Sequence, residues 1–134
     1  MNILFGWHLD GYAARQKENV LGKVILGPQG LLSVLETRLG LSGVWAAHTV
    51  RLVQYQHCLR EADDGHRFYS ASFDIDAFAV AETLLHWRDT WVVAGWDGTA
   101  DQNVSKRLQD MAAVEAVAQA QLGQGLGERL RAVL

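Results

Sequence analysis

The chain has 134 residues, of which 49% are hydrophobic and 20% are charged, and its formal net charge is −3. A chain of this length can bury well over half of its unfolded surface, so the composition favours one compact domain over residues 1–134. The negative net charge excludes a global basic field that would hold nucleic acid by counterion release, so DNA contacts would have to come from a local patch or from another part of a larger protein.

The first segments read as two short strands and a helix. The predicted strands cover residues 2–9 and 20–26. The ten loop residues between them cannot hold a crossover helix, so we expect the strands to pair antiparallel or not at all. The sequence GPQG, from Gly27 to Gly30, reads as a turn. A short helix with an apolar stripe and a C-terminal cap at Gly40 follows. The stripe consists of Leu31, Leu32, Leu35 and Leu39.

A second helix is predicted from about residue 44 to residue 62, with Ser42 as its N-cap. Its apolar positions recur at spacings of three and four, which is the helical period. They are Trp45, Thr49, Leu52, Tyr55 and Leu59. The sequence DDGH ends this helix, and RFYSASF (67–73) reads as a brief extended segment.

The clearest helical pattern spans about residues 77–94, with Asp76 at the N-cap position and Gly95 where a left-handed C-terminal residue belongs. Thr99-x-x-Gln102 resembles a capping box for a next helix. A last helix is predicted after Gly127. These elements predict an α/β fold dominated by about five helices, with a small sheet of short strands and a P-loop-like strand–turn–helix.

The segment around Gly27 has the outline of a nucleotide-binding P-loop. A Walker A loop, G-x-x-x-x-G-K-[ST], needs a second glycine, a lysine for the terminal phosphates and a hydroxyl for magnesium. Counted from Gly27, those three positions hold Leu32, Ser33 and Val34. ATP hydrolysis is therefore not expected. The helix N-terminus still leaves Gly27 and Gly30 as candidates for a weak phosphate contact.

Patterns for a nuclease centre or a metal site are weak. A PD-(D/E)XK centre needs an acidic residue two positions before a lysine. The residues two before the chain's three lysines are Arg15, Leu21 and Val104. Acidic residues at 63, 64, 74 and 76, with a histidine at 66, resemble a metal cluster only loosely, because carboxylates at helix ends usually cap N–H groups or close turns. We predict no metal and no cofactor in this segment.

Nucleophilic catalysis is not predicted either. His57 and Cys58 are neighbours on a predicted helix and point about 100° apart, so they do not form a dyad by themselves. Ser70 and Ser72, with His86, lack the G-x-S-x-G elbow of a hydrolase. No catalytic residue is therefore assigned.

The five tryptophans are the remaining candidates for contact with a partner. Tryptophans can stack bases in single-strand binders, but Trp87 and Trp91 lie on an apolar helix face that favours the core. Trp96, in the turn after that helix, is the candidate for an external partner. Arg88 is an interaction candidate as well, with a carboxylate from a neighbouring element as its expected partner.

The chain carries no membrane-length apolar run, which would need about 18 residues. Residues 1–9 are too short for a signal peptide and lack a basic leader, and Cys58 alone cannot form an intramolecular disulfide. These features predict a cytoplasmic protein with no membrane partner. The apolar, helically spaced ending LGERLRAVL leads us to expect the N-terminal piece of a longer polypeptide.

Four segments together resemble a known family. They are GPQGLLSVLETRLGL, RLVQYQHCLREAD, RFYSASFDIDAFAVAETLLHWRDTWVVAGWDG and LGERLRAVL, and the most specific block is A-x-x-L-L-x-W-R-D-x-x-x-x-A-G-W-D-G at residues 81–98. They resemble the N-terminal region of bacterial PD-(D/E)XK nuclease-family proteins, similar to the B subunit of AddAB-type helicase–nucleases. The residues that match the family pattern are Gly27, Gly30, Trp87, Arg88, Asp89, Gly95, Trp96 and Asp97.

The resemblance implies a helicase-like N-terminal domain with a degenerate P-loop, in a protein that processes double-strand DNA ends for recombination and repair. The exonuclease centre of such proteins lies far downstream. The implied partners are the remainder of the same polypeptide and a helicase subunit, with DNA bound mainly through other domains. Two other functions stay open: binding of a nucleotide or other phosphorylated ligand at Gly27–Gly30, and protein–protein docking through the tryptophan-rich helix.

Overall fold

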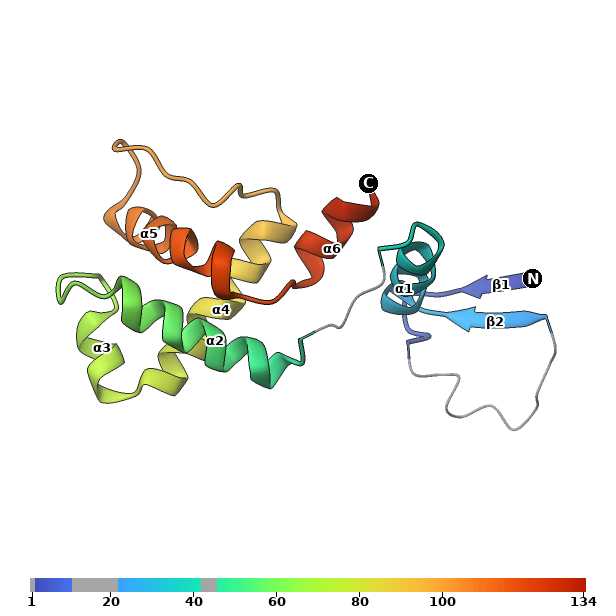
Figure 1. Ribbon diagram of the computed structural model, residues 1–134, viewed down its shortest axis with the longest axis horizontal. Helices are drawn as coiled ribbons and strands as arrows, with labels where there is room; N and C mark the ends of the chain where they lie inside the picture. Colours follow the sequence, from blue (N-terminus) through green and yellow to red (C-terminus); the bar gives the residue numbers. More distant parts are fainter. Residues whose placement is uncertain (1, 11–21, 42–45) are drawn as a thin grey trace. The chain divides into compact units, whose positions relative to one another are not determined.

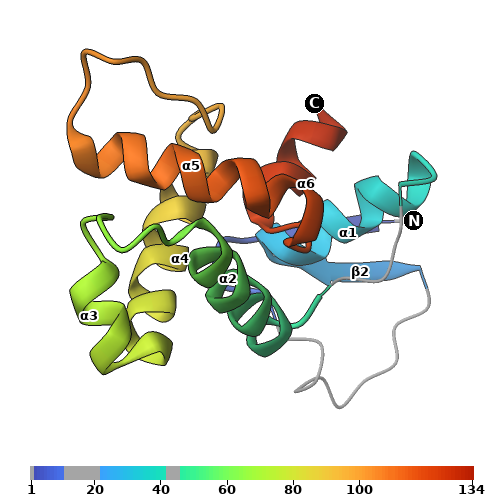
Figure 2. The same ribbon diagram turned by 60° about the vertical axis from the view of Figure 1, so that its left-hand side comes forward.

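The structure is a computed structural model that describes residues 2–10, 22–41 and 46–134. These residues form two strands and six helices (Figures 1 and 2), which confirms that the fold is dominated by helices and has a small sheet. In chain order they are β1 (Asn2–Phe5), β2 (Lys23–Leu26), α1 (Pro28–Arg38), α2 (His48–Ala62), α3 (Ser70–Ile75), α4 (Ala77–Val93), α5 (Lys106–Gln121) and α6 (Leu126–Val133).

The chain divides into two compact units. Unit 1 consists of residues 1–44 and 129–134, and unit 2 of residues 45–128. Unit 1 thus contains the sheet and α1, whereas unit 2 contains α2, α3, α4 and α5. That residues 1–134 form a single helicase-like domain stays a prediction.

The sheet of unit 1 is parallel, so the expectation of antiparallel or absent pairing is wrong. β1 and β2 pair in register from Asn2 with Lys23 to Phe5 with Leu26. A parallel pair needs a connection of about a dozen residues or more. Residues 6–22, which join the two strands, are long enough for such a connection. The loop and strand residues predicted within 11–21 lie outside the described residues.

Only Gly27 lies between β2 and α1, so the predicted GPQG turn is wrong for its last three residues, which are helical. Gly27 is the N-cap and Pro28 is the first helical residue, where its missing N–H costs no hydrogen bond. Gly30 therefore lies in the first turn of the helix. At the other end Gly40 has a φ of +69°, and the N–H of Leu41 donates to the carbonyl of Glu36 at 2.8 Å, which confirms the predicted cap.

The predicted leucine stripe of α1 is wrong for its second half. Leu32 is buried, but Leu35 is 40% exposed and Leu39 57% exposed. The other buried position of the helix is Glu36, whose carboxylate accepts two hydrogen bonds from Arg129 at 2.9 Å. The second buried position of this helix is therefore an ion pair that the predicted leucine stripe did not include.

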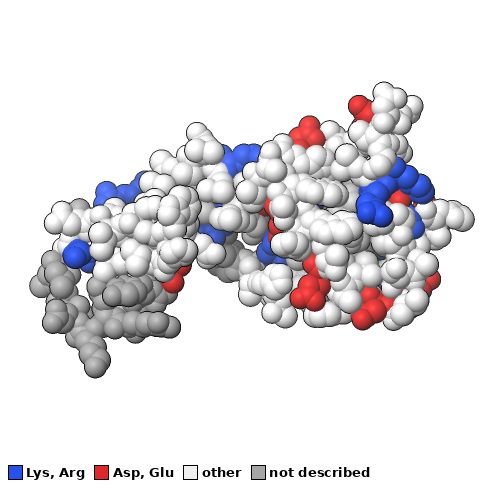
Figure 3. Space-filling view, turned by 180° about the vertical axis from the view of Figure 1, so that it is seen from behind, with Lys and Arg blue, Asp and Glu red and all other residues white. Residues whose placement is uncertain are grey.

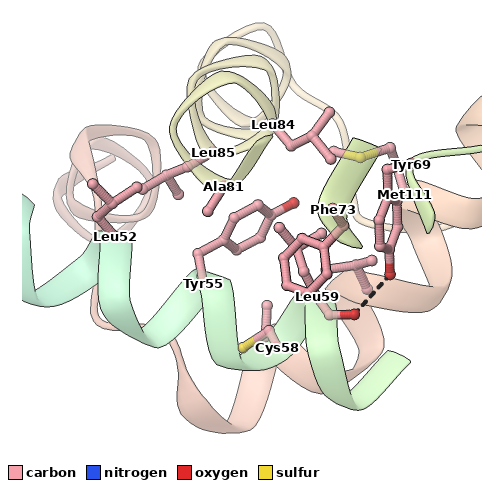
Figure 4. Packing of buried hydrophobic residues seen from close by; sticks show 12 residues of the cluster. Leu52, Tyr55, Cys58, Leu59, Tyr69, Phe73, Ala81, Leu84, Leu85 and Met111 are labelled. Carbon is pink, nitrogen blue, oxygen red and sulfur yellow. Dashed lines mark hydrogen bonds between the residues drawn. The ribbon is translucent and has the colours of Figure 1, made fainter. Parts of the chain in front are cut away.

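Unit 2 has a continuous apolar core. Helix α2 packs against both α4 and α5, and α3 packs against α4. Tyr55, Cys58 and Leu59 of α2 are fully buried within this core (Figure 4). The hydroxyl of Tyr69, drawn with a dashed line in Figure 4, donates to the carbonyl of Leu59 at 2.9 Å. The remaining core residues are Leu52, Phe73, Ala81, Leu84, Leu85, Met111, Val114 and Ala118.

The helix predicted over residues 77–94 is confirmed at both ends. The carboxylate of Asp76 accepts a hydrogen bond from the N–H of Ala79 at 3.0 Å, as an N-cap side chain does. Gly95 has a φ of +106°, the left-handed conformation that ends helices.

Three other boundaries in unit 2 differ from the prediction. Helix α2 starts at His48 with Ala47 as its N-cap, while Ser42 and Trp45 lie outside the described residues. Segment 67–73 is not extended: α3 begins within it, because Tyr69 and Phe73, one helical turn apart, both pack into the core. The capping box at Thr99 is also wrong, since α5 starts six residues later, with Ser105 as its N-cap.

Candidate functional site

The N-terminus of α1 is held by a carboxylate of the chain itself. The two oxygens of Asp10 accept hydrogen bonds from the backbone N–H groups of Gln29 and Gly30, each at 3.0 Å. A Cβ atom built on Gly27 would lie 2.4 Å from the Asp10 side chain, so the close approach requires glycine at this position. Gly27 thus serves the contact with Asp10, and Gly30 supplies one of its two donors.

The position of Asp10 affects whether Gly27 and Gly30, the candidates for a phosphate contact, are available to an anion. First-turn N–H groups are the donors that a helix offers to an anion. Here two of them already donate to a carboxylate, and neither a lysine nor a hydroxyl follows as in a Walker A loop. The donors at Gln29 and Gly30 are thus occupied by an aspartate of the chain itself.

Sequence reasoning missed Asp10 because it did not expect parallel strands. In a parallel pair the carboxyl ends of both strands meet at one edge of the sheet. Residues that follow β1 are thereby brought beside the residues that follow β2. The Asp-Gly dipeptide at residues 10–11 was the available signal.

Arg88 lies in the core of unit 2 and is 4% exposed. Its Nε and Nη2 atoms donate to the two carboxylate oxygens of Glu115 at 2.9 and 2.8 Å, which confirms the expected partner from a neighbouring element. Glu128 forms a further ion pair with Arg88 at 2.5 Å. Burial alone lowers the pKa of Arg88, but the hydrogen bonds and charges of Glu115 and Glu128 outweigh burial and raise it.

A second pair extends this cluster to α2. Arg51 donates through both Nη atoms to the carboxylate of Asp89 at 2.7 and 2.8 Å, and through Nε to the carbonyl of Gly123 at 3.0 Å. Burial raises the pKa of Asp89, but the hydrogen bonds and charges of Arg51 and Arg88 outweigh burial and hold it below its usual range. Both guanidiniums of this network are paired with carboxylates of the same unit, which is the arrangement of a structural element.

Trp87, Trp91 and Trp96 form an aromatic cluster at the C-terminal end of α4. Trp87 and Trp91 are stacked at 6.3 Å with an interplanar angle of 29°, and Trp96 meets Trp91 edge-on at 5.6 Å. The indole Nε1 of Trp96 donates to the carbonyl of Thr99 at 2.9 Å, so it braces the turn after the helix. The cluster packs against the core and keeps part of each ring exposed.

A hollow of about 500 Å³ lies beside these rings. It is lined by Trp91, Ala94, Trp96, Ser105, Arg107 and Leu108. Trp96, the candidate for an external contact, therefore borders a concave surface. Arg107 was not singled out in the sequence, because nothing in its local pattern distinguishes it from a solvated helix residue.

The other acidic candidates hold turns and helix ends. Asp63 accepts hydrogen bonds from the N–H of Gly65 and the hydroxyl of Ser70, and Asp64 accepts one from the N–H of His66. Within residues 2–10, 22–41 and 46–134 no three His, Cys, Asp or Glu side chains gather closely enough to hold a metal ion. Burial raises the pKa of the Cys58 thiol, which opposes formation of a reactive thiolate.

No family model, curated protein or solved structure matches this chain. In the described part of the chain, none of the helices has both the length and the apolar character needed to cross a bilayer.

Proposed function

We propose that this chain is a non-catalytic, helicase-like scaffold at the N-terminus of a nuclease that processes double-strand DNA ends. The observation that carries the proposal is the pair of hydrogen bonds from the first turn of α1 to Asp10. They give the strand–turn–helix a structural use in place of a triphosphate site. The resemblance of residues 81–98 to PD-(D/E)XK nuclease-family proteins supplies the nuclease context.

The contacts of that block support a scaffold role. Arg88 and Asp89 are both paired within unit 2, to Glu115 and Arg51. Gly95 ends α4 in a left-handed conformation, and the Asp97 carboxylate accepts hydrogen bonds from the N–H and hydroxyl of Thr99. Each of these residues has a structural role within unit 2, so no catalytic role has to be assigned to it.

The distribution of charge supports DNA contact through other domains. Unit 2 carries six Lys and Arg residues against twelve Asp and Glu, a net charge of −6. Figure 3 shows acidic side chains scattered over the visible face of this unit. A surface of this sign repels the phosphate backbone.

Two experiments test the proposal. The first reads the open reading frame that encodes the chain beyond Leu134, where we expect an acidic-x-Lys motif of a PD-(D/E)XK centre. A frame that ends at Leu134, or continues without such a motif, would contradict the nuclease context.

The second experiment incubates the purified chain with linear duplex DNA, magnesium and ATP. We expect neither DNA degradation nor ATP turnover, and turnover that copurifies with the chain would contradict the non-catalytic role.

A second function, docking of a protein partner on the tryptophan-rich helix, is favoured by one observation. The exposed parts of Trp91 and Trp96 border a hollow of a size that admits side chains of another protein. The binding of a phosphorylated ligand at Gly27–Gly30 has no corresponding observation in its favour, because the donors there are used by Asp10.

A further inference from the structure

Arg107, the second residue of α5, lies over two aromatic rings. Its guanidinium carbon is 5.4 Å from the ring centre of Phe68 and 5.7 Å from that of Trp87. At these distances the guanidinium is attracted to the faces of both rings. The two contacts therefore restrain the Arg107 side chain before any ligand arrives.

The charge of Arg107 is not neutralised within the described part of the chain. Arg51, Arg67, Arg88 and Lys106 of the same unit each pair with a carboxylate. Arg107 forms no ion pair with any described Asp or Glu, and its side chain is exposed. Arg60 is the other described arginine of unit 2 that forms no ion pair, so the surroundings of Arg107, and not its charge alone, distinguish it. A guanidinium fork fits a carboxylate in a bidentate manner.

Arg107 also lines two hollows. The first is the hollow of about 500 Å³ beside Trp91 and Trp96. The second has about 380 Å³ and is lined by Phe68, Tyr69, Ser72, Ala79, Val80, Thr83, Leu84 and Arg107. Both are bordered by aromatic and aliphatic side chains, and Arg107 borders each of them. The three features together form one surface, which we call the Arg107 groove.

The charges of unit 2 decide between the two classes of ligand that aromatic rings and arginine can bind. Single-stranded nucleic acid stacks bases on such rings, but it carries a phosphate at every nucleotide and needs a cationic track. Unit 2 has a net charge of −6 and offers one exposed, restrained arginine in this groove. A peptide can supply one carboxylate and otherwise apolar side chains, and so it fits this distribution better.

We propose that the Arg107 groove binds a short peptide segment of a protein partner, in which one acidic side chain lies between two apolar or aromatic side chains. The carboxylate pairs with the guanidinium of Arg107, and the flanking side chains enter the two hollows. The proposal goes beyond the scaffold role and does not depend on the nuclease context, because the groove lies wholly within unit 2.

The test is a selection of peptides from a random phage-displayed library on the chain of residues 1–134. We expect enrichment of peptides with an Asp or Glu between apolar residues. In titrations with the synthetic peptides, Arg107→Gln should weaken binding about tenfold or more, because it removes a charge-assisted hydrogen-bonded pair. Ala94→Asp, which places a charged side chain at the edge of the larger hollow, should weaken binding as well.

Arg60→Gln is the matched control. Arg60 also lies over an aromatic ring, that of Phe73 at 5.8 Å, but it borders neither hollow. Its substitution should leave peptide affinity unchanged. The proposal is overturned if no such peptides are enriched, or if the selected peptides bind Arg107→Gln as tightly as the unaltered chain. It is also overturned if a thymidine oligonucleotide, and not a peptide, binds in a manner that depends on Arg107. Circular dichroism of each variant shows whether a loss of binding reflects a loss of fold.

Discussion

The two units of the chain bury their apolar side chains to different extents. In unit 2, Tyr55, Cys58 and Leu59 of α2 are fully buried. In unit 1, Ile3, Leu4 and Phe5 of β1 are 44%, 47% and 43% exposed. Two-stranded sheets are marginally stable in water, and parallel sheets are usually covered on both faces. The difference teaches that apolar burial holds unit 2 together, whereas the described part of unit 1 relies more on individual polar contacts.

The two units also differ in net charge. Unit 1 has six Lys and Arg against three Asp and Glu, a net charge of +3, whereas unit 2 has a net charge of −6. Two of the three acidic residues of unit 1, Asp10 and Glu36, hold parts of its fold. Substitutions in the two units should therefore differ in both size and kind of effect.

The largest effect is expected for Arg88→Ala in the core of unit 2. The substitution leaves Glu115 buried without its cation, which should lower the free energy of unfolding by about 3–5 kcal/mol. Urea unfolding followed by tryptophan fluorescence measures it. The double variant Arg88→Met with Glu115→Leu should recover most of the loss. Lys106→Ala, which removes an exposed partner of Asp110, should cost less than about 1 kcal/mol.

The contrast in burial is tested by one leucine from each unit. Leu59→Ala removes fully buried methyl groups and should lower the free energy of unfolding by about 2–5 kcal/mol. Leu4→Ala, on the half-exposed β1, should lower it by less than about 1 kcal/mol. Chemical denaturation of the two variants measures both losses in the free energy of unfolding. Equal losses would show that the comparison of the units is wrong.

A smaller effect is expected for Asp10→Ala in unit 1. The carboxylate acts on α1 as an N-cap side chain does, so its loss should destabilise the helix by about 0.5–2 kcal/mol. Faster hydrogen exchange of the amides at Gln29 and Gly30 reports it. Asp74→Ala, at an exposed acidic position, serves as the control and should leave these amides protected.

The smallest effect concerns pH. Asp89 has a depressed pKa in the folded chain, so its contribution to stability is complete above about pH 4, the ordinary value of an aspartate, and is lost as the pH falls through the folded value. The melting temperature should fall as the pH is lowered from 7 to 2, and it should fall less in Asp89→Asn, because the variant lacks the titrating group. Thermal unfolding over this pH range measures it. An identical fall in both proteins would mean that the pair with Arg51 contributes nothing.

The sequence predicted best where the local signals agree with the packing. Helix α4 was predicted almost to the residue because Asp76, the apolar spacing and Gly95 all favour the same element. Segment 67–73 was misjudged because its aromatic residues fit a strand as well as a short helix, and contact with Leu59 decides between them.

The candidate sites depend on contacts that no local pattern contains. Asp10 and Gly27 come together only because the strands are parallel, and Arg107 meets Phe68 only because α5 packs beside the α2–α3 connection. The partner of Arg88 could be predicted as a carboxylate, since a buried arginine requires one, but not as Glu115. Along the chain, 19 residues separate Asp10 from Gln29, and 27 separate Arg88 from Glu115.

The most direct test of the account is calorimetric titration of the chain with ATP and magnesium. The Asp10 carboxylate accepts hydrogen bonds from the first-turn amides of α1, and no lysine follows in the loop. We therefore predict no heat of binding at millimolar nucleotide. Asp10→Asn, which removes the carboxylate charge, should not create tight binding, since the lysine is still missing. Saturable binding of nucleotide by the unaltered chain, lost when Gly30 is replaced by a bulky residue, would contradict the central claim.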